Sequence, residues 1–293
     1  MPTECIHSAA RPLTASVSII VAAKNSLPQL RRFVEDFRRR RPAGVNAVIV
    51  DGGSTDGTGE WLDTLATDGW TADLRWISRP DSGIAEAWNR GVAMADGDWV
   101  LFLGCDDQCG DPDAWRQAVA AIERLPDCCG VAAFPIEMIS PAGVPIDTIV
   151  PRLGSRGEAL LAVNTIPHQG AFHRRRLWDT LGPFDSAFPV ACDYEFLLRV
   201  LLAGIEIRTV DCPAPVRMTF GGASKRDPLQ NLREFRAAQI KHGVRGFRPG
   251  WWSACVLAIL RSWTQPVIGD AASGWLADTV RRFRGLPKAW TVR

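Results

Sequence analysis

Apolar runs and segments of helical periodicity alternate along the first part of the chain, from residue 17 to residue 122. The runs are rich in β-branched residues and apolar on both faces, which is typical of strands in a mostly parallel sheet covered by helices. This pattern predicts an α/β fold. The expected strands are 17–23, 47–51, 74–78 and 99–103, and the expected helices are 28–40, 60–65, 84–95 and 114–123.

The rhythm changes after residue 129, where longer strands are expected around the turn SPAGVP. A helical stretch near 155–163, the segment IPHQGAF and the apolar helix DYEFLLRVLLAG follow. We expect this part to form a mixed sheet that completes the same α/β domain. A polar helix is predicted at 228–242, and a boundary near residue 225 divides the chain into a domain 1–225 and a C-terminal helical extension 226–293.

The extension has a composition of its own. Its stretch WWSACVLAIL, residues 251–260, is flanked by Arg248 and Arg261 and followed by GWLADTVRRFRGLPKAW. Trp, Leu and Arg at helical spacing suit a helix that lies on an anionic membrane surface. A helix packed on the α/β domain is the other interpretation, and the pattern favours neither.

Composition limits the class of protein. With 46% hydrophobic and 23% charged among its 293 residues the chain is an ordinary globular protein, and a net charge of +2 gives no argument for nucleic-acid binding. The eight cysteines include no CxxC pair, which argues against a zinc site or a disulfide framework and favours a reducing cytoplasm. Residues 1–15 lack an apolar core of signal-peptide length, so we expect no secretion. The sequence also has no run of about 18 apolar residues that would predict a membrane-spanning helix.

Polar residues follow three predicted strands, at the edge where open α/β sheets bind their ligands. The first strand ends in AAKN, the second in DGGSTDGT and the fourth in GCDDQ. Asp51 stands at the tip of the second strand, where a carboxylate can accept hydrogen bonds from a ribose or a base. A purely turn-forming role for this segment stays open. Because there is neither a Walker lysine nor a GxGxxG motif here, a P-loop or nicotinamide site is excluded.

Asp106 and Asp107 are adjacent carboxylates directly after the apolar strand WVLFL. They repel one another and would disfavour a diphosphate, unless a divalent cation lies between them and the phosphate oxygens. Mg²⁺ and Mn²⁺ prefer such oxygen ligands. Taken alone, the pair also suits a solvated turn or a helix cap, but Asp51 on the same sheet edge favours a metal site.

Five segments of the chain carry a family resemblance, in the expected order: SIIVAAKN, VIVDGGSTDGTGEWL, RPDSGIAEAWNRGVAMADGDWVLFLGCDD, PHQGAFHRRRLW and GPFDSAFPVACDYEFLLRVL. They resemble those of the family 2 glycosyltransferases with the GT-A fold, especially bacterial members that build surface polysaccharides. The resemblance covers roughly residues 16–222. It implies a Rossmann-like nucleotide-binding half with a mostly parallel sheet, a mixed acceptor-side half and C-terminal helices.

The resemblance implies a nucleotide-sugar site, for a UDP-sugar above others, at the strand ends. Asp51 would contact the uracil or ribose, helped by the backbone near Ala22 and Ala23, and residues of DSGIAEAWNRG would line the donor pocket. The donor-binding residues expected in this way are Ala22, Ala23, Asn25, Asp51, Asp81, Gly83, Asn89, Arg90, His168 and Gln169.

The same resemblance assigns the metal. Asp106 matches the last acidic residue of the DxD motif that holds Mg²⁺ or Mn²⁺, and Asp107 matches an acidic residue often found after it. Gly104 departs from the pattern, because many relatives have Asp or Asn there. The expected metal ligands are therefore Asp106 and Asp107.

The acceptor side should carry the general base. Asp193, at the start of an apolar helix, matches the base expected in this family, and a carboxylate there can take the proton from an attacking sugar hydroxyl. An N-cap of a helix 194–202 is the alternative role for Asp193, and Glu195 is the alternative base.

His168 and Gln169 in PHQGAF are expected to face the donor phosphates or the acceptor, although a hydrogen-bonded structural role is open for the histidine. His173 could join His168 in a metal site. Their five-residue spacing on a presumed strand places them on opposite faces, which argues against such a pair.

The resulting hypothesis is an inverting, metal-dependent glycosyltransferase of the hexosyltransferase type. Its acceptor would be a glycan or a polyprenyl-linked glycan of cell-surface polysaccharide synthesis, reached in the cytoplasm or at the cytoplasmic face of the inner membrane. A noncatalytic subunit that binds a sugar nucleotide or glycan with the same fold is the alternative. A sugar nucleotidyltransferase is disfavoured, because its glycine-rich, arginine-containing phosphate loop is missing near the N-terminus.

Overall fold

The computed structural model describes residues 16–41, 44–67, 73–155, 157–220 and 228–244, together with single positions from 256 onward. Most of the tail segment 251–260 lies outside the described residues, so both interpretations of the tail stay predictions. Within the described part of the chain, no helix is long and apolar enough to cross a membrane.

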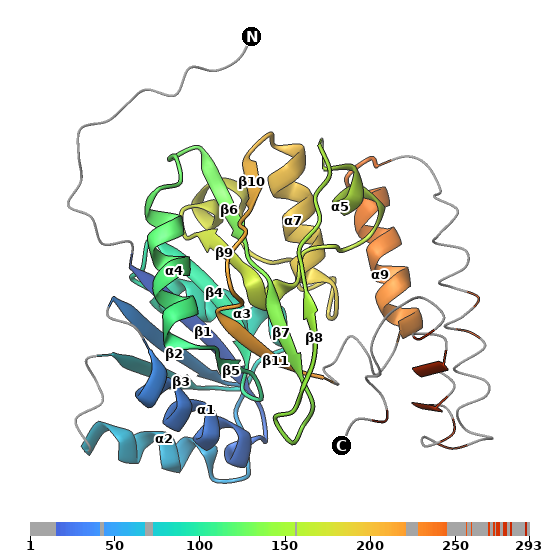
Figure 1. The fold of residues 1–293 in the computed structure, drawn as a ribbon. Helices are drawn as coiled ribbons and strands as arrows, with labels where there is room; N and C mark the ends of the chain where they lie inside the picture. The colour runs from blue at the N-terminus through green and yellow to red at the C-terminus, as the bar shows by residue number, and fades with distance from the viewer. Residues whose placement is uncertain are drawn as a thin grey trace.

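A seven-stranded sheet forms the centre of the molecule (Figure 1). Its strand order is β10-β6-β9-β4-β1-β2-β3, and every pairing is parallel except those of β9 with β4 and β6. The prediction of a mostly parallel sheet that becomes mixed in its second half is confirmed. The strands are β1 (Val17–Ala23), β2 (Val45–Asp51), β3 (Leu74–Ser78), β4 (Trp99–Gly104), β6 (Cys129–Ala133), β9 (Ala171–Arg174) and β10 (Glu206–Thr209).

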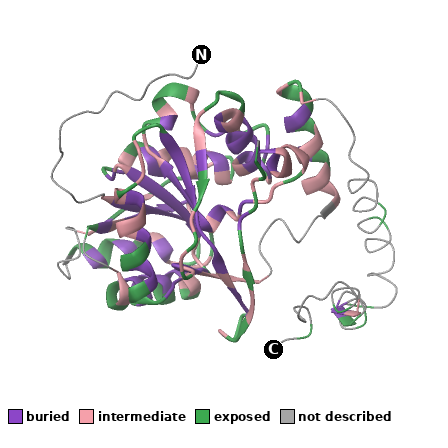
Figure 2. Cartoon of the chain, turned by 45° about the horizontal axis from the view of Figure 1, so that its top comes forward, coloured by how far each residue is buried: buried purple, intermediate pink, exposed green. Residues whose placement is uncertain are grey.

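Helices cover both faces of this sheet, and its strands are mostly buried (Figure 2). Successive residues of a strand point to opposite faces, so Ile19 joins the core under α1, α2 and α4, whereas Ile20 joins the core under α3, α6, α7 and α9. The helices are α1 (Leu27–Arg40), α2 (Thr58–Thr67), α3 (Ile84–Met94), α4 (Pro112–Glu123), α5 (Glu158–Ala162), α6 (Leu177–Leu181), α7 (Cys192–Leu202) and α9 (Pro228–Lys241).

The four predicted helices of the first half are all present, with small shifts at their ends. Helix α4 begins at Pro112 rather than residue 114, because the carboxylate of Asp111 accepts a hydrogen bond from the Asp113 amide at 2.7 Å and caps the helix. Proline suits this first position, since its missing N–H would have no partner there.

A second sheet of four strands has the order β5-β11-β7-β8. Its strands, and those of the first sheet after residue 129, have at most five residues, so the expectation of longer strands is wrong. Pro135 has no N–H for a ladder and stands between β6 and β7, where the chain leaves the first sheet and enters the second. The strands of the second sheet are β5 (Gln108–Cys109), β7 (Ile136–Ile139), β8 (Pro145–Ile149) and β11 (Val216–Thr219).

Candidate active site

Asp51 ends β2, and its buried carboxylate turns back into the loop that follows. One oxygen accepts hydrogen bonds from the Ser54 amide at 3.1 Å and the Ser78 hydroxyl at 2.6 Å, and the other accepts from the Ser54 hydroxyl. Asp51 therefore fixes the start of the loop 52–57 and joins it to the end of β3. Its contact with a nucleotide stays a prediction.

The loops after β1 and β2 are bonded into one unit. Asn25 has the left-handed φ of 48°, its amide donates to the Ser54 hydroxyl at 2.7 Å, and its side-chain oxygen accepts from the Thr55 amide at 2.8 Å. Ala23, the last residue of β1, accepts a hydrogen bond from the Gly52 amide through its carbonyl. The expected donor residues Ala22, Ala23, Asn25 and Asp51 thus lie together at one edge of the sheet.

Asp56 completes this unit, although we did not predict a role for it. One oxygen accepts from the Leu27 amide at 2.9 Å, and the other accepts from the Thr58 hydroxyl at 2.6 Å. The bond from Thr58, followed by that from Leu27, lowers the pKa of Asp56. The carboxylate of Asp56 therefore accepts hydrogen bonds from the first residues of both α1 and α2. In the sequence, only its position ahead of a helix could have indicated this role.

Asp81 lies against the same unit. Its carboxylate oxygen Oδ2 is 2.6 Å from the point that a Cβ of Gly52 would occupy, and Oδ1 accepts from the Gly83 amide at 3.1 Å. Only glycine at position 52 permits this approach. The geometry brings Asp81 and Gly83 to the edge that carries Asp51.

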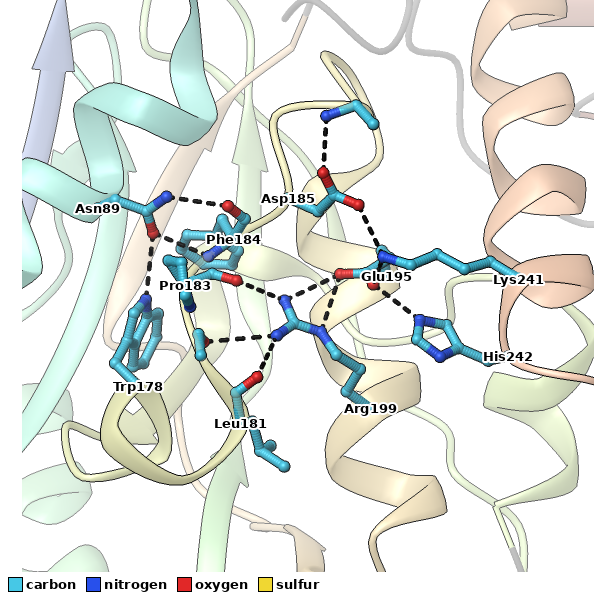
Figure 3. A network of polar contacts seen from close by, with 12 residues as sticks. Asn89, Trp178, Leu181, Pro183, Phe184, Asp185, Glu195, Arg199, Lys241 and His242 are labelled. Atoms are coloured by element: carbon cyan, nitrogen blue, oxygen red, sulfur yellow. Dashed lines mark hydrogen bonds and ion pairs between the residues drawn. The ribbon is translucent and has the colours of Figure 1, made fainter.

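Asn89 and Arg90 use their side chains within the protein. Asn89 donates to the Phe184 carbonyl at 2.9 Å and accepts from the Phe184 amide at 2.8 Å (Figure 3). Arg90 donates to the carbonyls of Arg79 and Pro80 at 3.1 and 2.9 Å. Both side chains hold backbone of neighbouring segments, and their contact with a donor stays a prediction.

The turn that follows β4 separates its two aspartates. Asp107 is 3% exposed and accepts from the amides of Gly104 and Thr219 at 2.9 and 3.1 Å. Burial, with the charge of Asp106, raises the pKa of Asp107 to about 7. Asp106 is exposed, and among the described residues no donor is bonded to its carboxylate. Asp107 closes the turn, whereas Asp106 faces outward.

Gly104 has a structural reason to be glycine. A Cβ at this position would lie 2.7 Å from the carboxylate oxygen Oδ1 of Asp106, closer than real Cβ contacts come. The departure from the DxD pattern therefore goes with the close approach of Asp106 to the backbone of the turn.

The turn after β4 suits a metal ion only if the substrate supplies most of the ligands. In the part of the chain that the structure describes, no group of three or more His, Cys, Asp or Glu side chains could hold an ion. Mg²⁺ and Mn²⁺ are nevertheless often held by one or two carboxylates together with substrate phosphates and water. The exposed Asp106 suits such a site, in which the donor diphosphate supplies most of the ligands.

His168 lies in a cluster of aromatic rings instead of facing outward. It belongs to the 3₁₀ turn η2 (His168–Gly170), is 7% exposed and stacks on Phe102 with ring centroids 5.1 Å apart. Burial lowers the pKa of His168 well below 6.5 and that of His173 to about 4, so both rings are neutral at pH 7. Gln169, by contrast, lies in the turn η2, which packs against β4 and β11, and its side chain lowers the pKa of Asp107.

The expectation that His168 and His173 lie on opposite faces of a strand is wrong. Only His173 is in β9, because the chain turns through η2 before the strand begins. The two ring centroids are 5.8 Å apart. The alternation of a strand cannot be applied across such a turn.

Asp193 is the second residue of α7 and is partly exposed. The N-cap is Ala191, so the alternative role of Asp193 as N-cap is wrong. Its carboxylate accepts a hydrogen bond from the Asn164 side chain at 3.1 Å, and burial raises its pKa to about 6. We did not predict Asn164, and no local pattern marks it.

Glu195 is wholly buried among cations (Figure 3). It accepts hydrogen bonds from Arg199 Nε at 3.0 Å, from Lys241 Nζ at 2.8 Å and from His242 Nε2 at 2.7 Å. These contacts tie α7 to α9 and explain how a charge is kept in the core. Of the two carboxylates expected to act as base, only Asp193 reaches solvent.

One short segment connects the two acidic positions. Asn164 is bonded to Asp193, and five residues later Gln169, in a turn packed against β4 and β11, lowers the pKa of Asp107, the neighbour of Asp106. Five extended residues span at most about 17 Å. The segment 164–169 therefore limits the distance between the expected base and the acidic turn, and their joint action at one site stays a prediction.

Comparisons with known proteins agree with the family resemblance stated from the sequence. The family model described as Glycosyl transferase family 2 matches residues 18–184. An uncharacterized glycosyltransferase of Mycobacterium tuberculosis is 32% identical over 223 residues, which is 75% of this chain and 82% of the relative. A PGL/p-HBAD biosynthesis glycosyltransferase of the same species is 32% identical over 189 residues, 62% of this chain and 68% of the relative.

Solved structures share the fold at low sequence identity. S. aureus TarS 1-349 in complex with UDP-GlcNAc is 18% identical with a TM-score of 0.58, over 77% of this chain and 66% of that chain. The mannosyltransferase PcManGT from Pyrobaculum calidifontis, in complex with GDP-Man and Mn²⁺, is 19% identical with a TM-score of 0.57, over 90% of this chain and 75% of that chain.

Proposed function

The chain belongs to glycosyl transferase family 2 and has the GT-A fold, and on that premise we propose that it is an inverting enzyme that transfers a sugar from a UDP-sugar to a glycan or lipid-linked glycan. The observation that carries this proposal is the short segment 164–169, in which Asn164 is bonded to Asp193 and Gln169 lowers the pKa of Asp107, next to Asp106. A base and a diphosphate site must stand on either side of the sugar for a single displacement to occur.

Asp193 is the proposed general base. It is partly exposed, so the hydroxyl of an acceptor can reach it, and Asn164 orients its carboxylate. A pKa raised to about 6 keeps the group ionised at pH 7 while leaving it basic enough to take a proton as the new bond forms. The acceptor oxygen attacks the anomeric carbon from the side opposite the departing nucleoside diphosphate. The configuration at that carbon is therefore inverted.

Asp106 is the proposed metal residue, with Mg²⁺ or Mn²⁺ as the ion. Such an ion, when bound, neutralises charge on the departing nucleoside diphosphate. The Mn²⁺ in the PcManGT complex supports this choice. Asp107 and Gln169 hold the turn from which Asp106 projects.

The donor is proposed to lie over the unit formed by the loops after β1 and β2. Asp51 and Asn25 shape these loops, and Asp81 and Gly83 border them. UDP-GlcNAc in the TarS complex and GDP-Man in the PcManGT complex support a nucleotide-sugar donor.

The acceptor is proposed to be a glycan or polyprenyl-linked glycan of the cell envelope, met in the cytoplasm or at the cytoplasmic face of the membrane. The relative whose name includes PGL/p-HBAD biosynthesis supports a biosynthetic role. Contact of the tail with a membrane surface belongs to the same proposal.

A donor screen tests the function. The full chain is incubated with UDP-glucose, UDP-galactose, UDP-N-acetylglucosamine and GDP-mannose, with Mn²⁺, Mg²⁺ or EDTA, and both the thermal midpoint and the release of nucleoside diphosphate are measured. We expect one donor to stabilise the protein and, with water taking the place of the acceptor hydroxyl, to be hydrolysed slowly to sugar and nucleoside diphosphate only with a metal. Stabilisation without release under any condition would favour the noncatalytic binding subunit.

A further inference from the structure

Helix α7 begins without a capping side chain of its own. Its N-cap is Ala191, and the residue at the third helical position is Tyr194, so neither half of a capping box is present. The first amides of a helix have no partner within the helix and need an acceptor from elsewhere.

Glu234, in the middle of α9, supplies an acceptor at this end. Its oxygen Oε2 accepts hydrogen bonds from the amides of Val190 and Ala191, both at 2.8 Å. The side chain is 9% exposed, and its other oxygen accepts from Gln230 at 2.9 Å. A carboxylate at a helix N-terminus is also favoured by the helix dipole.

The residues that flank Asp193 are bonded to α9 as well. Gln239 donates to the Tyr194 hydroxyl at 3.0 Å and to the carbonyl of Leu161 at 3.1 Å. Lys241 and the adjacent His242 bind Glu195. Residues 190, 191, 194 and 195 are thus held by one helix, while the carboxylate of Asp193 among them stays accessible.

Two polar groups from different elements act on the Asp193 carboxylate. Burial raises the pKa of Asp193 most, the hydrogen bond from Asn164 in the segment 164–169 lowers it, and the negative charge of Glu234 raises it by a smaller amount. From its own helix, the Tyr194 amide also lowers this pKa, and Cys192 is the adjacent titratable group. Glu234 therefore acts on Asp193 both through the backbone of α7 and through its charge.

We propose that Glu234 is a positioning residue for Asp193, and that α9 contributes to the active site through Glu234. Glu234 holds the first turn of α7 so that the carboxylate of Asp193 points to the acceptor hydroxyl. This inference rests on the proposed role of Asp193 as the base.

Two variants separate the bond from the charge. Glu234→Gln keeps an oxygen that can accept from both amides but removes the charge, and Glu234→Ala removes both. Glu35→Gln, on the exposed face of α1, is the matched control that removes one distant charge. The rate is the release of nucleoside diphosphate from whichever of the four donor sugars the wild type turns over fastest, followed from pH 5 to pH 9 with the Kd of UDP.

We expect Glu234→Ala to lower kcat about tenfold to a hundredfold through misplacement of the base, with an unchanged Kd for UDP. Because loss of a negative charge lowers the pKa of Asp193, Glu234→Gln should move the acidic limb of the pH profile to lower pH. Carboxyl NMR of Asp193 should show the same displacement without any turnover. Amides 190 and 191 should exchange faster with solvent in Glu234→Ala.

The inference is overturned if Glu234→Gln leaves both the acidic limb and the carboxyl titration of Asp193 where they are in the wild type. It is also overturned if Glu234→Ala keeps the wild-type kcat. Should Glu234→Ala fail to fold, the titration in Glu234→Gln decides alone. Failure of the proposed function is distinguishable, because the wild type would then release no nucleoside diphosphate from any donor, whereas a wrong base assignment alone would leave Asp193→Asn with the turnover of the wild type.

Discussion

At the scale of single residues, the turn after β4 shows how the absence of a side chain at one residue affects the position of the next carboxylate. Asp107 is buried and bonded to two amides, and Asp106 projects beside it with an oxygen close to the α-carbon of Gly104. Glycine at position 104 offers no side-chain oxygen to a metal. Because it also has no Cβ, the carboxylate of Asp106 can lie close to the backbone there. The position of Asp106 depends on a missing Cβ.

Gly104→Ala tests this dependence. A Cβ 2.7 Å from the Asp106 oxygen forces the carboxylate to move, but this carboxylate is the end of an exposed side chain that can rotate away, so we expect the free energy of unfolding to change by less than about 1 kcal/mol. Metal-dependent binding of UDP should weaken in the same variant. Thermal unfolding and calorimetric titration of UDP with and without Mn²⁺ measure both. Gly44→Ala, before the opposite end of β2, is the control: its φ of 79° makes alanine costly in stability, but UDP binding should stay as in the wild type. Unchanged metal-dependent binding of UDP in Gly104→Ala would contradict the account.

At the scale of elements, the segment between α5 and β9 joins the two halves of the candidate site. The side-chain oxygen of Asn164 accepts from the Ile166 amide at 3.2 Å, and its side-chain nitrogen donates to Asp193. Both polar atoms of the Asn164 side chain are therefore hydrogen-bonded. Gln169 then reaches the turn of Asp107. The segment has little regular structure, yet its side chains set the environment of both carboxylates.

Asn164→Ala should displace the titration of Asp193 in the direction opposite to that of Glu234→Gln. The lost hydrogen bond favoured the charged carboxylate, so its pKa should rise above about 6, and the acidic limb of the pH profile should move to higher pH. The measurement is kcat against pH. Thr165→Val, which removes the adjacent hydroxyl bond to the Arg152 carbonyl, should leave the limb in place. A limb that does not move in Asn164→Ala would remove the orienting role.

The elements and the site differ in how far they can be predicted from sequence. The strands β1 and β4 are continuous apolar runs, and all of β1 to β4 were predicted within two residues. Asp51 and Asp106 were expected together because they follow strands of one sheet, and Asp81 was added to them by the family resemblance. The partners Asn164, Glu234 and Thr219 were not found, since their bonds join residues 29 to 112 positions apart and leave no local pattern. His168 was expected to face a ligand, because its motif does not reveal that the chain turns before β9.

At the scale of the whole molecule, the acceptor side is held together by charges around Glu195. Arg199 binds Glu195 and also donates to the carbonyls of Leu181 and Pro183, both at 2.7 Å, next to the backbone that Asn89 holds (Figure 3). Lys241 adds α9 to this network by binding Asp185 and Glu195. The network therefore extends from α3 through α7 to α9, which lies beyond the boundary expected near residue 225.

Arg199→Met should destabilise the protein strongly. It leaves a fully buried carboxylate short of one cation and frees two backbone carbonyls, which we expect to cost about 3 kcal/mol. Arg208→Met breaks the pair with Glu206 at a half-exposed strand edge and should change the free energy of unfolding by less than about 1 kcal/mol. Urea unfolding of both variants makes the comparison, and similar losses would show that burial of Glu195 has no special weight.

The central claim, that Asp193 takes the proton of the acceptor, is tested most directly by turnover of Asp193→Asn at saturating donor. Asparagine preserves the shape and the contact with Asn164 but cannot accept the proton, so we predict a fall in kcat of about 10²-fold to 10⁴-fold with an unchanged Kd for UDP. Turnover within a few-fold of the wild type, with the donor bound equally well, would contradict the claim.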